Sequence, residues 1–236
     1  MSDFDRNYAS PFGQATTRAD AAAVDAGLRA YMLKIYNYMT IGLAITGLAA
    51  LGVYMAAVTG DATGAAARIG TSTYLTSFGY ALFVSPLKWA FILAPLAMVF
   101  VISFGIQRLK PATAQMLFWV FSALMGVSLS SIFLVYTHTS IVRVFFITAA
   151  SFGALSLYGY TTKRDMSGIG SFLLMGLFGV IIAMLVNLFL QSSMLQFVVS
   201  VIGVLVFAGL TAWDTQRLKN DYIYGYASAG GEVAER

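Results

Sequence analysis

Six apolar runs, each long enough to cross a lipid bilayer, constrain this chain more than any other feature. A spanning helix needs about 20 mostly apolar residues, because the hydrocarbon core is about 30 Å thick and a helix rises about 1.5 Å per residue. Backbone groups in lipid have no water to bond, so such runs predict helices, whereas a barrel would show short alternating segments. The predicted fold class is therefore all-α, a polytopic transmembrane helix bundle. Its six spans are Tyr36–Val58, Trp89–Ile106, Ala112–Tyr136, Ile141–Tyr160, Ile169–Leu190 and Leu195–Trp213.

Composition supports a membrane protein and excludes several kinds of site. Hydrophobic residues make up 59% of the 236 residues and charged residues 10%, far fewer charges than the roughly 25% of a soluble domain. Without cysteine there is no disulfide, no thiolate nucleophile and no cysteine-bound metal, and His138 is the single histidine. The net charge of +4 comes from basic residues scattered beside the apolar runs. We therefore expect the lipid bilayer as a partner, no nucleic acid and no metal site.

The positions of lysine and arginine predict an orientation. With the N-terminus in the cytoplasm, 11 of the 14 basic residues fall on inside segments. The outside segments then hold Arg68, Lys88 and Arg143. Because these residues played no part in finding the apolar runs, they support the six-span count independently.

Three regions follow from this arrangement. Residues 1–34 are charged and lack a short apolar core, so they predict a soluble N-terminal cytoplasmic tail rather than a cleavable signal peptide. Residues 35–219 form the helix bundle, and residues 220–236 form a polar C-terminal segment. The one long connection, 59–88, is rich in Gly, Ser and Thr and predicts turns and a short hairpin outside the membrane.

Several residues suggest local structure within the bundle. Pro95 should kink the second span, and Asp165 or Ser167 should cap the start of the fifth. Asn187 is expected to bridge helices by hydrogen bonds. Small residues on the first and fifth spans predict close backbone approach, although glycine is also common in membrane helices generally. These residues are Gly42, Gly47, Gly52, Gly170, Gly176 and Gly179.

The chain offers little for catalysis. Ser128, Ser130 and Ser131 could act as nucleophiles, but His138 lies in the next external loop. Hydrogen bonding of these serines to backbone or to a neighbouring helix is the better interpretation. There is no phosphate-binding glycine loop and no His-Glu pair at metal spacing. We therefore expect no enzyme, no catalytic residues and no cofactor.

Asp214, at the end of the sixth run, is the acid joined directly to a spanning segment. An ionised carboxylate at bilayer depth costs about 3 kcal/mol, so it must be compensated or lie shallow. In one interpretation, Arg217 pairs with it along the same helix face at the headgroup level and neither residue has a function. In the other, Asp214 faces the bundle interior, and its protonation breaks the Arg217 contact and loosens this end of the bundle. The pair would then be a gate and a pH sensor.

Two stretches resemble the Bax inhibitor-1/YccA family, namely "YGYTTKRDMSGIGSFLLMG" (158–176) and "FAGLTAWDTQRLKNDYI" (207–223). The resemblance extends from about residue 23 to the end. It implies a seven-helix bundle, location in the bacterial inner (plasma) membrane, and a pH-sensitive leak channel for calcium or other cations. It also implies a proton-sharing carboxylate pair on the sixth and seventh helices, of which Asp214 matches the first. For the bacterial branch it implies binding and modulation of the membrane-bound protease FtsH.

After Lys219 the sequence shows no seventh hydrophobic span, so the second carboxylate of the family pattern is absent from it. We expect the chain to be part of a longer one rather than a member that lacks the helix. The leading functional hypothesis is a cation leak gated at Asp214 and Arg217. The alternative is a non-conducting partner that modulates FtsH through its N-terminal tail. A proton-coupled transporter is less favoured, because a relay would need several ionisable groups at membrane depth.

Overall fold

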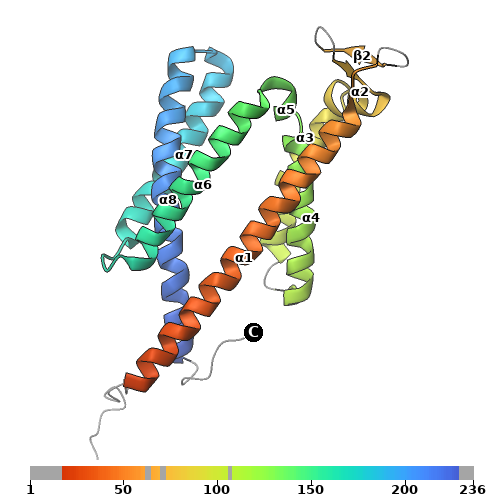
Figure 1. Ribbon diagram of the computed structural model, residues 1–236. Helices are drawn as coiled ribbons and strands as arrows, with labels where there is room; N and C mark the ends of the chain where they lie inside the picture. The colour runs from red at the N-terminus through yellow and green to blue at the C-terminus, as the bar shows by residue number, and fades with distance from the viewer. Residues whose placement is uncertain (1–17, 62–64, 70–72, 106–107, 229–236) are drawn as a thin grey trace, which may run out of the picture. The chain divides into compact units, whose positions relative to one another are not determined.

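Six long helices dominate the computed structural model of the chain, which describes residues 18–61, 65–69, 73–105 and 108–228 (Figure 1). Within these residues, six spans are long and apolar enough to cross a membrane, and each contains or closely matches one predicted run; the third span, Pro111–Val135, consists of α4 and the helical turn after it. The all-α fold class and the six-span count are therefore confirmed. The helices are α1 (Arg18–Ala57), α3 (Lys88–Gly105), α4 (Pro111–Leu129), α6 (His138–Thr161), α7 (Ser167–Leu190) and α8 (Ser193–Ser228).

The first and last helices are longer than the apolar runs that predict them. α1 has 40 residues and α8 has 36, which correspond to lengths of about 60 Å and 54 Å. Both lengths clearly exceed the hydrocarbon thickness of about 30 Å. Part of the predicted N-terminal tail and part of the polar C-terminal segment are therefore helical.

The long connection after α1 forms a small β-sheet motif, as expected from its turn-forming residues. Strands β1 (Val58–Thr59), β2 (Ala67–Arg68) and β3 (Tyr74–Leu75) pair antiparallel in the order β1-β3-β2. The short helix α2 (Ser77–Phe83) follows, and the Thr76 hydroxyl caps it by accepting from the Gly79 N–H at 3.1 Å. Leu75 of β3 is fully buried within this motif. The predicted hairpin is confirmed, and one further turn of helix, α5 (Ile132–Val135), separates α4 from α6.

The chain divides into two compact units. Of the described residues, unit 1 comprises 18–34 and 153–228, and unit 2 comprises those between 35 and 152. In unit 1, α7 and α8 form an antiparallel hairpin, and in unit 2, α3 and α4 are neighbours (Figure 1). α1 and α6 contribute residues to both units.

Close approach at glycine holds α1 against α4 in unit 2. A methyl group placed on Gly42 would meet the Phe118 ring at 2.7 Å, and one on Gly126 would strike the Thr46 carbonyl oxygen. The Thr46 hydroxyl donates across the same seam to the Ser122 carbonyl at 2.8 Å. Small residues and a side-chain hydrogen bond thus bring two backbones together, as is common between membrane helices.

The predicted glycine contacts are confirmed at some positions and not at others. Gly42 and Gly170 each lie tightly against a neighbouring helix, and Gly176 lies against Val206. Nothing lies within 4 Å of a methyl group placed on the three other glycines. These are Gly47, Gly52 and Gly179. The same residue type at similar spacing therefore does not reveal which face of a helix is packed.

Large apolar side chains cover the outer surface of the α7–α8 hairpin. Phe172 is 72% exposed, Met175 73% and Phe189 83%. A soluble protein rarely exposes so continuous an apolar surface. Lipid contact explains it, in agreement with the lengths of the helices.

Candidate functional site

Gln216 joins α8 to the loop between α6 and α7 within unit 1. Its side chain is 6% exposed, and its Oε1 accepts from the Met166 backbone N–H at 2.9 Å. Its Nε2 donates to the Arg164 carbonyl oxygen at 2.6 Å. A single primary amide thus satisfies one donor and one acceptor of a loop that has no regular secondary structure.

Lys219 makes a second connection one turn further along α8. Its ammonium group donates to the Tyr160 carbonyl oxygen at 2.9 Å and lies 5.6 Å from the centre of the Tyr160 ring. Tyr160 is in the last turn of α6, where carbonyl groups lack helical partners and a positive charge is favourable. Lys219 therefore caps α6 from a different helix.

The helices approach closely at the same level. A methyl group on Gly159 of α6 would strike the Ala212 carbonyl oxygen of α8, and one on Gly170 of α7 would strike the Trp213 ring. Gln216 follows Ala212 by four residues and Trp213 by three, so it continues the packed faces of α8. The two sequence stretches that carry the family resemblance therefore pack against each other, and we refer to the residues Tyr160, Arg164, Met166, Gln216 and Lys219 as the loop clamp.

Asp214 and Arg217, the predicted gate residues, lie on this turn of α8 but outside the loop clamp. The Asp214 side chain is exposed, whereas Thr215 and Gln216 beside it are buried. Arg217 lies close enough to Asp214 for electrostatic attraction. Its ion pair, however, is with Asp221 at 4.0 Å, and its guanidinium lies 5.6 Å from the centre of the Trp213 ring. Gating by Asp214 and Arg217 stays a prediction.

Asp165 supports the start of α7, but the predicted N-cap at Asp165 or Ser167 is wrong. Its Oδ1 accepts from the Ser167 backbone N–H at 2.9 Å, although the residue in the cap position itself is Met166. The hydrogen bonds from Ser167 hold the pKa of the Asp165 carboxyl below its usual value, because they favour the charged form. This carboxylate lies in the loop and belongs to the structural support of the site.

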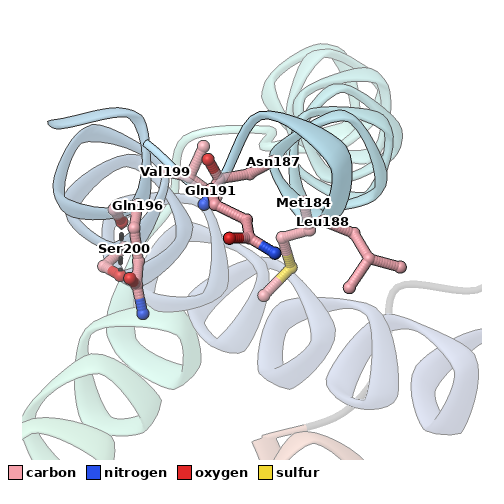
Figure 2. A pocket seen from close by; sticks show the side chains of 7 residues that line it. All are labelled: Met184, Asn187, Leu188, Gln191, Gln196, Val199 and Ser200. Atoms are coloured by element: carbon pink, nitrogen blue, oxygen red, sulfur yellow. Dashed lines mark hydrogen bonds between the residues drawn. The ribbon is translucent and has the colours of Figure 1, made fainter. Parts of the chain in front are cut away.

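A groove lies at the other end of the α7–α8 hairpin (Figure 2). Asn187 does not bridge helices as predicted; its Oδ1 accepts from the Ser192 N–H at 3.0 Å, in the turn after its own helix, and stabilises this turn. Gln191, in the left-handed conformation with φ of 50°, completes the connection. The groove has a volume of about 450 Å³ and no titratable residue lines it. Its lining residues are Met184, Asn187, Leu188, Gln191, Gln196, Val199 and Ser200.

The candidate nucleophiles have structural partners. The Ser130 hydroxyl donates to the Val127 carbonyl at 2.6 Å, and that of Ser131 points to the Ser128 carbonyl at 3.4 Å. The His138 ring packs 5.8 Å from Tyr54, measured between ring centres. The predicted backbone hydrogen bonding is confirmed for Ser130 and Ser131. In the described part of the chain, no three His, Cys, Asp or Glu side chains gather as a metal site would require.

Sequence reasoning missed Gln216 and Lys219. An acid beside an apolar helix stands out because of its charge, whereas a glutamine at a helix end resembles an ordinary surface residue. The available signal was spacing, since Gln216 and Lys219 follow Ala212 by four and seven residues and so share its helix face.

Comparison with known proteins identifies relatives over nearly the whole chain. Residues 28–231 match the family model described as inhibitor of apoptosis-promoting Bax1. An uncharacterized protein of Rickettsia prowazekii is 46% identical over 221 residues, which cover 94% of this chain and 84% of the relative. The inner membrane protein YbhL of Escherichia coli K12 is 46% identical over 195 residues, covering 83% of this chain and 76% of the relative. No solved structure matches.

Proposed function

Because the chain belongs to the family of the inhibitor of apoptosis-promoting Bax1, we propose that it is a pH-sensitive leak pathway for calcium or another cation, gated at Asp214 and Arg217. The proposal includes location in a bacterial inner membrane, because the Escherichia coli relative YbhL is named as an inner membrane protein. The chain itself is a membrane protein with six helices able to span a bilayer, counted over its described residues.

The observation that carries the proposal is the position of Asp214 on α8. It is an acidic residue within a span-capable helix, and it lies two residues before the buried Gln216 that holds the α6–α7 loop. An ionisable group at membrane depth is by default a functional candidate, because its desolvation is costly. A change in the charge of Asp214 would act on the same helical turn that holds the loop clamp.

Calcium flux into proteoliposomes across a pH series tests the gate. We expect the original protein to leak calcium with a clear pH response, and Asp214→Asn to lose that response. Asp221→Asn is the matched control, because Asp221 is exposed on the same helix and pairs with the same arginine. Equal leak and equal pH response for the original protein and Asp214→Asn would reject gating at Asp214.

A second candidate function is a non-conducting partner of a membrane protease such as FtsH. The observation in its favour is the first part of α1, where Leu28 and Met32 are buried while Asp25, Arg29 and Lys34 are exposed. A helix docked on one side and charged on the other presents a surface for another protein. Reversing the three charges should abolish co-purification with the protease and leave any calcium flux intact, whereas unchanged co-purification would reject this candidate.

A further inference from the structure

We infer that Gln216 and Lys219 are positioning residues, which lock the α6–α7 loop onto α8 and so fix the helical turn that carries Asp214. All three of their hydrogen bonds end on backbone atoms of residues 160–166. The hydrogen bonds of this loop clamp therefore restrain the course of the loop's backbone. The inference rests on the proposed function only for its consequence on cation leak.

The chemistry of the clamp at Gln216 is specific for a primary amide. The loop offers an acceptor at Arg164 and a donor at Met166, two residues apart, and the amide matches both. A methionine side chain has similar length but no comparable donor or acceptor. An ionised glutamate can accept from Met166 but cannot donate to Arg164, and a protonated glutamate can do both. These differences allow the clamp to be tested without a large change in side-chain shape.

Lys219 anchors the other end of the loop. It is the capping cation for the last turn of α6, and its ammonium is also held by the Tyr160 ring. With Gln216 holding Arg164 and Met166, the end of α6 and the loop that follows it are tied to neighbouring turns of α8. The turn of Asp214 and the end of α6 therefore move together while the clamp is closed.

Thiol labelling tests the clamp directly, because the chain contains no cysteine. The Met166 side chain is 6% exposed, so a cysteine introduced by Met166→Cys should react slowly with a bulky maleimide. Adding Gln216→Met should speed this reaction by about tenfold or more, because a buried thiol reacts through local opening and two hydrogen bonds oppose that opening. Gly168→Cys is the control, since this position is exposed and a side chain there meets nothing within 4 Å.

We expect the Gly168→Cys reaction to be equally fast with and without Gln216→Met. Equal reaction rates at Met166→Cys with and without Gln216→Met would overturn the inference. Hydrogen exchange of the Met166 amide in the cysteine-free protein provides a second measurement. Its protection should fall in Gln216→Met, and unchanged protection would overturn the inference in the same way.

Gln216→Glu gives a signature that a purely packing role would not show. At neutral pH this variant should melt at a lower temperature than the original protein, and the gap should narrow on acidification as the introduced carboxyl becomes a donor. The difference in melting temperature between Gln216→Met and the original protein should stay constant across the same pH range. The surrounding charged groups are Arg164 and Asp165 in the loop and Lys219 and Asp214 on α8, and all are common to the three proteins. Parallel pH profiles for the two variants would contradict donation from Gln216 to the Arg164 carbonyl.

The consequence for leak separates this inference from the proposed function. If the gate is correct, Gln216→Glu should raise calcium leak at neutral pH, where the original protein is closed, because the Asp214 turn is no longer fixed. If the original protein passes no calcium at any pH, the proposed function fails. Thiol labelling and hydrogen exchange still test whether Gln216 holds the loop. Calcium leak that responds to Asp214→Asn but not to an open clamp would overturn the positioning role.

Discussion

At the scale of single residues, Gly159 is the position where the contact between α6 and α8 allows no side chain. A methyl group there would strike the Ala212 carbonyl oxygen and lie 3.0 Å from its carbon, both backbone atoms that cannot rotate away. Alanine gains up to about 1 kcal/mol over glycine in a helix interior, but overpacking costs about 1–3 kcal/mol. We therefore predict that Gly159→Ala lowers the melting temperature in detergent.

The control for this prediction lies on the same helix. Gly153 has nothing within 4 Å of an added methyl group, so Gly153→Ala should keep or raise the melting temperature through helix propensity alone. Similar losses of stability in both variants would show that the close contact at Gly159 is not the cause.

Asp165 gives a pH-dependent prediction at the same scale. Its pKa is lowered in the folded protein by hydrogen bonds from Ser167, so its contribution to stability is present above its ordinary pKa of about 3.9. That contribution is lost as the pH falls through the lower, folded pKa. Asp165→Ala should therefore reduce the melting temperature at pH 7, and the difference from the original protein should close in strong acid. A constant difference across the pH series would argue against capping by the charged carboxylate.

The candidate site shows what sequence reasoning can find at this scale. Asp214 could be selected from its charge next to an apolar run, and Asp165 could be expected to support a helix start from its position before one, although the N-cap itself is Met166. Gln216 could not, because its importance depends on the backbone course of a loop 50 residues earlier in the chain. Hydropathy does not show whether a glutamine side chain has a carbonyl group and an N–H group of another segment within hydrogen-bonding distance.

At the scale of elements, the helix cores could be predicted well and the helix ends could not. Hydropathy locates the lipid-exposed part of each helix, because the bilayer sets its length. The additional turns of α1 and α8 are amphipathic and are stabilised by packing, as between Tyr31 and Tyr222, whose ring centres are 5.1 Å apart. A charged segment that packs in this way contains no apolar run, so hydropathy does not predict that it is helical.

The α1–α4 seam provides a prediction at the element scale. A methyl group on Gly126 would strike the Thr46 carbonyl oxygen and lie 2.6 Å from the Ala49 Cβ, so Gly126→Ala must separate the two helices. Gly47 lies on α1 between these contacts yet faces open space. We expect Gly126→Ala to destabilise the protein by about 1–3 kcal/mol and Gly47→Ala to have no such effect. Chemical unfolding in detergent measures both, and equal destabilisation would contradict the assigned helix faces.

At the scale of the whole molecule, the side-chain contacts of unit 1 and the distribution of basic residues can be compared. The polar connections of unit 1 gather where α6 ends and α7 begins, whereas the α7–α8 turn has a groove without titratable residues. The positive-inside rule predicts that the first of these ends faces the cytoplasm, because Lys163, Arg164, Arg217 and Lys219 lie there. The predicted gate and the loop clamp therefore share the end of unit 1 that is expected to face the cytoplasm.

Membrane topology gives the last prediction. Three span-capable helices, α3, α4 and α6, separate the small β-sheet from the α6–α7 loop, so an odd number of crossings places the two on opposite sides of the membrane. The charge distribution predicts that the sheet lies outside. In the cysteine-free chain, Ala66→Cys should react with an impermeant thiol reagent in intact spheroplasts, and Lys163→Cys should react only after lysis, since both positions are exposed. Labelling of both from the same side would contradict three crossings between them, and the reverse pattern would contradict the cytoplasmic N-terminus.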